Sequence, residues 1–336
     1  MRSVPDSPSR PRVLSGIRPT GESFQLGNYV GAVRQWTTMQ DENDCFFFLA
    51  DLHALIDTPD PASLRSRTRE SVAELLALGV DPERSTIFVQ SHVREHVELA
   101  WVLGCLTAFG EASRMTAFKE KGGGTVGLFT YPVLQAADIL MYQADAVPIG
   151  EDQRQHLELT RDLAQRFNGR YGPTFRLPAP YSGQPGERIK DLQEPSRKMS
   201  KSTGGAGTVW VLDDARTITK KIRSAVTDTG REVRADDDKP GITNLLTILS
   251  VATGKAVPEL EAAYAGRGYG DFKGDVAEAV VELFAPVRER YAELVADPGG
   301  LDDVLARGAD RARGTAVATM DAVRARVGLL PPAPRA

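Results

Sequence analysis

The sequence predicts an α/β protein built on a doubly wound parallel sheet, followed by an all-helical C-terminal part. Three short apolar runs, at residues 13–17, 45–50 and 86–90, are rich in β-branched or aromatic residues. Each run is separated from the next by a segment of helical length and period. Strands that alternate with helices form parallel sheets. The pattern therefore indicates a Rossmann-like, nucleotide-binding sheet.

The segments around these runs account for the remaining elements. Helices are expected at residues 29–40, 61–78 and 93–108. Residues from about 111 to 174 contain a glycine-rich stretch and two long helical patterns, at 134–142 and 152–167, and are expected to form a helical insertion. Residues 209–212 predict a last short strand. Further helices are expected at 213–226, 242–253, 257–264, 275–295 and 301–327.

These elements divide the chain into two domains with a tail at each end. Residues 12–212 are expected to form the sheet domain with its insertion, and residues 213–328 the helical domain. Residues 1–11 are rich in proline and serine and residues 329–336 in proline, so both ends are expected to be flexible. A length of 336 residues is sufficient for two such domains.

The composition is that of a folded globular protein, with 41% hydrophobic and 26% charged residues. No apolar run approaches the roughly 20 residues of a membrane span, and the N-terminus lacks an apolar signal core. The cytoplasm is therefore the expected location. The two cysteines, Cys45 and Cys105, lack the CxxC spacing of a zinc site, and both are expected to be buried free thiols.

The net charge of −4 gives no overall attraction for nucleic acid, so an RNA partner would need local basic patches. For any one candidate residue taken alone, the expected role is part of a solvated helix face balanced by nearby acidic residues. The candidates are Lys220, Lys221, Arg223, Arg307, Arg311, Arg313, Arg324 and Arg326.

Two segments far apart in the sequence carry residues suited to a polyphosphate. Residues 198–202 read Lys-Met-Ser-Lys-Ser and combine two cations with two hydroxyls. Alone, such a loop is usually a solvated turn. Residues 19–28 read Pro-Thr-Gly-Glu-Ser-Phe-Gln-Leu-Gly-Asn and lie between the first predicted strand and the first helix. Glycines there permit close backbone approach, and the amides of a helix start favour an anion.

Residues 131–138 suggest a pocket for a small molecule. Tyr131, Gln135 and Asp138 are spaced by four and three residues, so they share one face of a helix. An ionised carboxylate only accepts hydrogen bonds, so a buried Asp138 would select a ligand with an N–H or O–H group at that point. The alternative is that Asp138 is a structural cap or a member of an ion pair.

These motifs resemble signatures of a known enzyme family. The segment at 19–28 resembles the HIGH signature of class I aminoacyl-tRNA synthetases, and the segment at 198–202 resembles their KMSKS signature. Further patterns narrow the resemblance to the tryptophanyl-tRNA synthetases. These are F-K-E-K at 118–121, Y-P-x-L-x-A-A-D-I-L at 131–140, V-P-x-G-E-D-Q-x-Q-H-L-E-L-T-R-D at 147–162, S-A-V-T-D at 224–228 and K-P-G-I-x-N-L-L at 239–246.

The resemblance implies an enzyme that activates L-tryptophan with ATP and transfers it to the 3′-terminal ribose of tRNA(Trp). Asp138 would accept the indole N–H, and the implied tryptophan-binding residues are Leu14, His53, Tyr131, Gln135, Asp138, Val147, Ile149 and Gln153. The implied ATP-binding residues are Arg18, Pro19, Thr20, Gly27, Asn28, Gly150, Glu151, Asp152, Ile189, Lys198, Met199, Ser200, Lys201 and Ser202. The implied catalytic residues are Lys121, Lys198, Ser200 and Lys201. Mg²⁺ would be held mainly by the ATP phosphates, without a metal site on the protein.

The resemblance also implies a homodimer, with one tRNA reaching across both subunits and its anticodon contacting the helical domain. Two alternatives remain. A tyrosyl-tRNA synthetase is one, because Tyr131, Gln135 and Asp138 would also suit the ammonium and phenol of tyrosine. The other is a non-catalytic paralogue that senses tryptophan, although such a protein would have little use for the lysines of residues 198–202.

Some residues depart from the family pattern. Gln25 stands first in the HIGH-like tetrapeptide, where Thr or His is usual, although its amide can still donate. Arg18, Leu52 and Gln135 replace residues common in bacterial relatives, which suggests a divergent subtype with an altered response to tryptophan-mimicking inhibitors.

His92 and His96 have the i, i+4 spacing of a metal-binding pair. No third ligand is evident near them in the sequence. A surface or partly buried helix pair is therefore expected.

Overall fold

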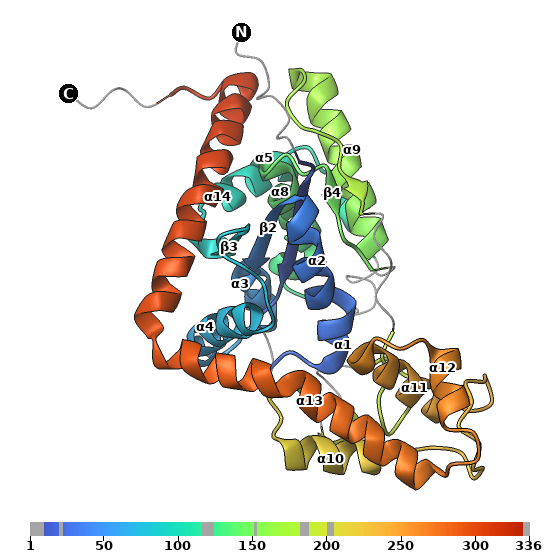
Figure 1. Cartoon of the computed structure of the whole chain (residues 1–336). Coiled ribbons are helices and arrows are strands. Elements are labelled where there is room, and N and C mark those ends of the chain that lie inside the picture. Colours follow the sequence, from blue (N-terminus) through green and yellow to red (C-terminus); the bar gives the residue numbers. More distant parts are fainter. Residues whose placement is uncertain are drawn as a thin grey trace.

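The structure is a computed structural model that describes residues 10–19, 23–115, 124–150, 153–181, 188–199 and 205–331. At its centre lies a parallel five-stranded sheet in the order β3-β2-β1-β4-β5, with helices around it (Figure 1). The expected α/β class is confirmed. The strands are β1 (Arg12–Ile17), β2 (Asp44–Leu49), β3 (Ser85–Val89), β4 (Ala146–Val147) and β5 (Ala179–Pro180).

The first three strands lie where the sequence predicts them, whereas β4 and β5 were not predicted and the strand prediction at residues 209–212 is wrong. β4 and β5 are two residues long, too short to show a pattern, and β4 lies within the segment expected to be a helical insertion. The strand predicted at 209–212 does not join the sheet. Instead, Trp210 forms a single antiparallel bridge with Gln25, so this segment supports the turn after β1.

The helices of the sheet domain also lie close to their predicted positions. A continuous helical segment of α1, η1 and α2 follows β1, and α8 starts earlier than predicted because the Thr125 hydroxyl accepts a hydrogen bond from the Leu128 amide at 3.3 Å. The bounds are α1 (Leu26–Asn28), η1 (Tyr29–Val33), α2 (Arg34–Glu42), α3 (Asp51–Ala54), η2 (Leu55–Asp57), α4 (Pro61–Ala77), η3 (Gln90–His92), α5 (Glu95–Gly104), α6 (Phe109–Ala112), α8 (Val126–Met141) and α9 (Arg154–Tyr171).

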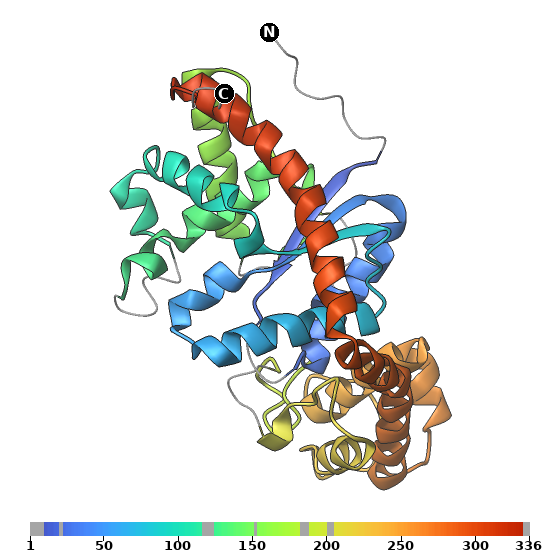
Figure 2. The same ribbon diagram turned by 90° about the vertical axis from the view of Figure 1, so that its left-hand side faces the viewer.

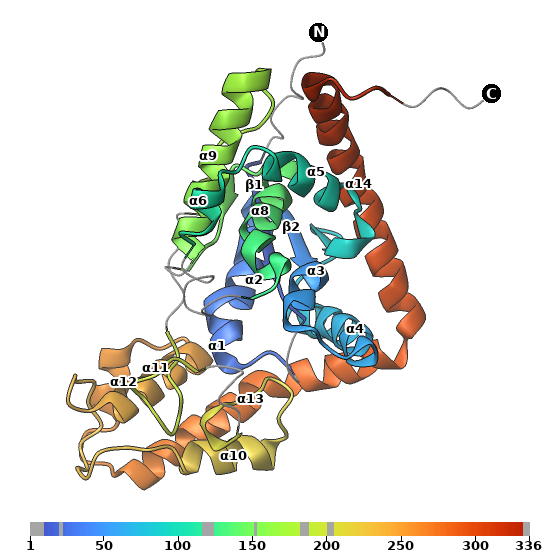
Figure 3. The same ribbon diagram turned by 180° about the vertical axis from the view of Figure 1, so that it is seen from behind.

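Alternate side chains of the central strands pack into two separate cores, as the two-residue period of a strand requires. In β2, Phe47 and Leu49 join one core with residues of α2 and α4. Phe46 and Phe48 join the other core with residues of α5, α8 and α9. The long helices α8 and α9 therefore lie on the same side of the sheet, seen from behind in Figure 3.

The C-terminal third is helical, as predicted. Its elements are η5 (Gly205–Gly207), α10 (Ala215–Arg223), α11 (Pro240–Thr253), α12 (Val257–Ala263), α13 (Tyr269–Ala296) and α14 (Pro298–Val327). Asp214 caps α10 by accepting a hydrogen bond from the Thr217 amide at 2.7 Å. Because α13 packs against α4 as well as against α10 and α11, it joins these helices to the sheet domain.

The last helix, α14, turns back along the sheet and lies against its edge strand β3 (Figure 2). A Cβ atom at Gly308 would collide with the carbonyl oxygen of Ile87, so only glycine allows this close approach. Arg324 of α14 pairs with Glu98 of α5. The division of the chain at residue 212 stays a prediction, but α14 packs with the sheet although the sequence grouped it with the other C-terminal helices.

The expectation that both cysteines are buried is confirmed for one of them and wrong for the other. Cys45 is buried in the core, as expected, whereas Cys105 is exposed where α5 ends, which contradicts the expectation. Among the described residues, no helix is long and apolar enough to cross a membrane.

Candidate active site

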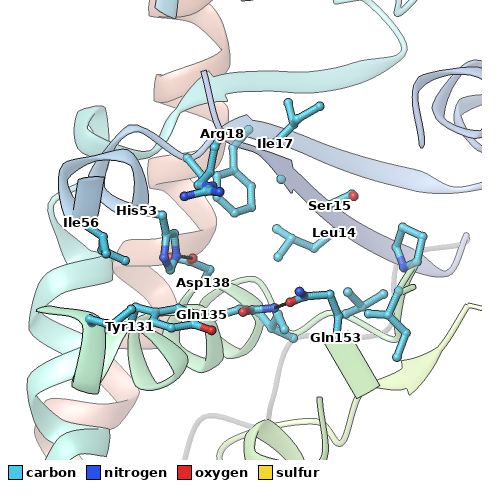
Figure 4. A pocket seen from close by; sticks show the side chains of 18 residues that line it. Leu14, Ser15, Ile17, Arg18, His53, Ile56, Tyr131, Gln135, Asp138 and Gln153 are labelled. Atoms are coloured by element: carbon cyan, nitrogen blue, oxygen red, sulfur yellow. Dashed lines mark hydrogen bonds and ion pairs between the residues drawn. The ribbon is translucent and has the colours of Figure 1, made fainter. Parts of the chain in front are cut away.

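A cavity of about 500 Å³ opens at the carboxyl end of the sheet, where the strand order reverses between β1 and β4 (Figure 4). Ligands bind at this place in doubly wound sheets. All eight residues predicted to bind the amino acid line it, together with Arg18. They come from β1, α3, α8, β4 and the segment after β4. The eight are Leu14, His53, Tyr131, Gln135, Asp138, Val147, Ile149 and Gln153.

Asp138 lies in the wall of this cavity, 1% exposed, and accepts hydrogen bonds from three side chains. Its Oδ2 lies 2.8 Å from Nε2 of His53. Its Oδ1 lies 2.8 Å from Nε2 of Gln90 and 2.6 Å from Nδ1 of His96. Burial by itself raises the pKa of Asp138, but the hydrogen bonds from His53 and His96 outweigh it, and the pKa lies below its ordinary value of 3.8. The carboxylate is therefore ionised and can only accept.

A chain of hydrogen bonds crosses the polar wall of the cavity. The Tyr131 hydroxyl lies 3.1 Å from Nε2 of His156, whose Nδ1 lies 2.8 Å from Oε1 of Gln153. Nε2 of Gln135 donates to the same Oε1 at 3.2 Å. Because this oxygen only accepts, Nδ1 of His156 carries a proton. The sequence analysis assigned no role to His156, whereas the structure shows that its ring links Tyr131 to Gln153.

The remaining walls are mainly apolar and suit a flat ring. Phe48 reaches the cavity because residue 16 is glycine, and any Cβ atom there would collide with the Phe48 ring. Several lining residues were missed by the sequence analysis, because most of them are isolated apolar side chains, which carry no motif. They are Ser15, Gly16, Ile17, Phe48, Ala50, Ile56, Leu128, Ile139 and Pro148.

The two predicted phosphate motifs meet although about 170 residues separate them. Nε2 of Gln25 donates to the Met199 carbonyl at 2.8 Å. The Met199 amide donates to the Ile189 carbonyl at 3.1 Å, and Lys190 bridges to Lys198 in antiparallel fashion. Asn244 of α11 holds this short hairpin by bonding both backbone groups of Lys190. Gln25 therefore ties the HIGH-like turn to the start of the KMSKS-like loop.

This contact changes the expectation for Gln25. One of the two N–H groups of its amide, which the sequence analysis expected to be able to donate, already bonds the Met199 carbonyl. The helix that follows begins at Leu26 rather than at the predicted residue 29. Its first amides are partly engaged, since the Leu26 amide donates to the Val209 carbonyl at 2.9 Å and the Asn28 amide to the Gln25 carbonyl at 2.8 Å.

The other predicted ATP residues are only partly described. Arg18 is half-exposed and pairs with Asp57 at 2.8 Å. Lys198 is exposed, whereas Pro19 and Ile189 are buried. Gly27, Asn28 and Gly150 are also described. Thr20, Lys121, Glu151, Asp152, Ser200, Lys201 and Ser202 lie outside the described residues.

The expectation for the histidine pair is wrong for one member. His92 is exposed, but His96 is fully buried and contacts Asp138. Sequence spacing could not reveal this contact, because it joins α5 to α8 across 42 positions. Gln90 and His96 are therefore the polar neighbours of the site that the sequence analysis missed.

Comparison with known proteins identifies the class. The family model of class I tRNA synthetases (W and Y) matches residues 7–285. The chain belongs to this family. It is 56% identical over 330 residues to tryptophan--tRNA ligase 2 of Streptomyces avermitilis, with 96% of this chain and 98% of the relative covered. It is 53% identical over 332 residues to tryptophan--tRNA ligase of Mycobacterium leprae, with 95% and 97% covered.

Solved structures agree with the sequence relatives. The tryptophanyl-tRNA synthetase of Mycoplasma pneumoniae matches with a TM-score of 0.86 at 35% identity, covering 96% of this chain and 98% of that one. The Campylobacter jejuni enzyme, complexed with ADP and tryptophan, matches with 0.83 at 34% identity, covering 95% and 100%. Within the family, the chain therefore belongs with the bacterial tryptophanyl-tRNA synthetases. Tyrosyl-tRNA synthetase from Aeropyrum pernix, at 22% identity and a TM-score of 0.65, shares the fold.

Proposed function

We propose that the cavity binds L-tryptophan and that the junction of the two motifs binds ATP, so that the chain forms tryptophanyl-adenylate and charges tRNA(Trp). One observation carries the proposal: a buried, ionised acceptor, Asp138, lies in the wall of a mainly apolar cavity of about 500 Å³. Such a site selects a flat apolar ring that carries one N–H group, and indole is this kind of ring.

The amino end of the substrate would face the polar wall. Tyr131, Gln135 and Gln153 present a hydroxyl and two amides that are linked through His156. The Tyr131 hydroxyl oxygen and the Gln135 amide oxygen can accept from an ammonium group, whereas Oε1 of Gln153 already accepts from His156 and Gln135 and orients the Gln135 amide. His53 and the apolar residues Leu14, Val147 and Ile149 would contact the indole ring and its edges.

ATP would lie beside Ile189 and Met199, whose backbones are paired, with Gly27 and Asn28 at the opposite side. Arg18, Pro19, Thr20, Gly150, Glu151 and Asp152 would complete this site. Mg²⁺ would enter with ATP, because phosphate oxygens are the hard ligands that it prefers. The Campylobacter neighbour, complexed with ADP and tryptophan, supports the proposal that this chain binds both a nucleotide and tryptophan.

In the reaction, the tryptophan carboxylate attacks the α-phosphate, and the bond to pyrophosphate breaks. Negative charge grows on the departing pyrophosphate, so Lys121, Lys198 and Lys201 would stabilise the transition state more than the ground state. Ser200 and Ser202 could donate hydrogen bonds to the same oxygens. Replacing Lys201 by Ala should therefore slow pyrophosphate exchange while leaving tryptophan affinity nearly unchanged, and a loss of affinity alone would refute this role.

In the second step, a terminal ribose hydroxyl of tRNA attacks the activated carbonyl and releases AMP. Lys220 and Arg223 are exposed on α10, which contributes no residue to the cavity wall, and could contact the RNA backbone. The arginines of α14 are weaker candidates, because Arg313 and Arg324 already pair with Glu95 and Glu98. Because tRNA charging serves the ribosome, we place the protein in the cytoplasm.

We further propose a homodimer, supported by an exposed apolar patch. Val97 and Trp101 of α5, Phe109 of α6 and Val126 of α8 are 55%, 76%, 78% and 78% exposed. These helices lie on the face seen in Figure 3. Large apolar side chains grouped on a surface mark protein interfaces. A second copy would cover this patch.

A charging assay tests the proposed function. Purified protein, ATP and Mg²⁺ should attach labelled tryptophan to tRNA(Trp), and should not attach tyrosine. Charging with tyrosine would favour the tyrosyl alternative. Tryptophan binding without adenylate formation would favour the sensing paralogue.

A further inference from the structure

The side chains behind Asp138 use most of its capacity to accept hydrogen bonds. A carboxylate has two oxygens and about four acceptor positions. Gln90 and His96 both donate to Oδ1, and His53 donates to Oδ2. No other described residue donates to this carboxylate, so one position remains, and it belongs to Oδ2. Asp138 and His53 line the cavity, whereas Gln90 and His96 do not.

The buried imidazole of His96 has its proton position fixed by two neighbours. Its Nδ1 lies 2.6 Å from Oδ1 of Asp138, and its Nε2 lies 2.7 Å from the hydroxyl of Tyr142. Burial, followed by the charges of Asp138 and Glu95, raises the pKa of Tyr142 well above its ordinary value, so this hydroxyl keeps its proton. Among the described residues the hydroxyl contacts no acceptor besides His96 Nε2. Nε2 therefore accepts, and Nδ1 donates to the carboxylate.

The buried side chain of Gln90 makes the folded state less stable than a buried apolar side chain would. It is completely buried, and its Oε1 has no hydrogen-bond partner among the described groups. A buried acceptor without a partner is destabilising, and an apolar side chain of similar size would avoid this. Its Nε2, however, lies 2.8 Å from Oδ1 of Asp138. The amide is explained by the donor that it supplies and not by packing.

We propose that His96 and Gln90 are positioning residues for amino-acid selection. They occupy both acceptor positions of Oδ1, hold the carboxylate in one orientation, and leave a single position on Oδ2 for the ring N–H group of the substrate. The inference rests on the proposed tryptophan site, because it requires that the ring N–H meets Asp138.

A purely structural role predicts a different behaviour. The His96 ring lies against Phe48, Phe88 and Tyr142, with centroids 6.2, 6.1 and 5.4 Å away. If packing were its whole contribution, a substitution would lower kcat/KM by the same factor for every amino-acid substrate. If His96 has a positioning role, a substitution lowers kcat/KM for tryptophan more than kcat/KM for an analogue that has no ring N–H.

Two substitutions of His96 separate these roles. The amide nitrogen of Asn stands as many bonds from Cβ as Nδ1, so His96→Asn can keep the donor to Asp138. His96→Gln carries its amide one bond further, toward Tyr142, and loses that donor. The readout is the ratio of kcat/KM for tryptophan to that for 3-(benzothiophen-3-yl)alanine, in which sulfur replaces the N–H group, measured by pyrophosphate exchange. This ratio does not depend on the fraction of folded enzyme.

We expect the ratio to fall about tenfold or more in His96→Gln, through KM for tryptophan, with KM for ATP unchanged. It should stay within about threefold of the wild type in His96→Asn. Gln90→Met, which removes the other donor, should lower the ratio in the same direction. An unchanged ratio in His96→Gln, or an equal fall in both His96 variants, would overturn the proposal. If the wild-type enzyme itself does not prefer tryptophan to the analogue, the proposed tryptophan site fails instead.

Discussion

The substitution Asp138→Asn isolates the interaction on which amino-acid choice depends. Asn has nearly the shape of Asp but keeps only one acceptor oxygen. Gln90 and His96 both donate at the Oδ1 position, so the Asn oxygen should settle there. Its NH₂ group would then take the Oδ2 position and face the ring N–H of the substrate. Two donors would meet where a donor and a charged acceptor met before.

The expected loss follows from this geometry. A hydrogen bond to a charged group contributes about 1.5–3 kcal/mol, so kcat/KM for tryptophan should fall roughly 10- to 150-fold. The benzothiophene analogue lacks the N–H group, so its kcat/KM should fall about threefold at most. Pyrophosphate exchange with both amino acids gives the ratio. Asp145→Asn is a matched control, because Asp145 pairs with Arg176 at the amino end of β4. If Asp138→Asn lowers kcat/KM equally for tryptophan and for the analogue, Asp138 does not select the ring N–H group.

Three further predictions concern other parts of the molecule. Replacing Gln25 by Ala removes its bond to the Met199 carbonyl and should raise KM for ATP about fivefold, with KM for tryptophan unchanged; equal rises would argue against the link. The pKa of Asp138 lies below 3.8, so calorimetry should find its contribution to tryptophan affinity constant from pH 7.5 to about 5 and lost only as the pH falls through that lowered pKa; a midpoint near pH 6 that Asp138→Asn abolishes would contradict this. Trp101→Asp should yield monomers by light scattering, whereas Leu330→Asp, at another exposed apolar residue, should not; a dimer that survives Trp101→Asp would exclude this patch.

Much of the sheet domain could be predicted because long strands and helices leave a periodic pattern. In β2, the residues from Cys45 to Leu49 form a continuous apolar run and pack alternately into the two cores. The helix α4 begins with Pro61 after the capping Asp60. β4 and β5 leave no such pattern, because each is only two residues long. They are strands only because the fold places β4 beside β1 and β5 beside β4. Residues 209–212 have a strand composition, yet their backbone pairs with the turn after β1.

The site divides along the same line. Tyr131, Gln135 and Asp138 were predictable because one helix presents all three on one face. Gln90 and His96 reach Asp138 from the end of β3 and from α5, and no spacing in the sequence encodes that contact. Phe48 enters the cavity only because residue 16 is glycine, which again requires two strands to be placed side by side.

In the proposed function, an ionised Asp138 selects indole and the adjoining motifs activate the bound amino acid with ATP. Amino-acid-dependent exchange of labelled pyrophosphate into ATP, measured with tryptophan and with tyrosine, tests this most directly. We expect exchange with tryptophan and at least about a thousandfold less with tyrosine, because the phenol places its O–H away from the position of the indole N–H. Comparable exchange with tyrosine, or none with tryptophan, would contradict it.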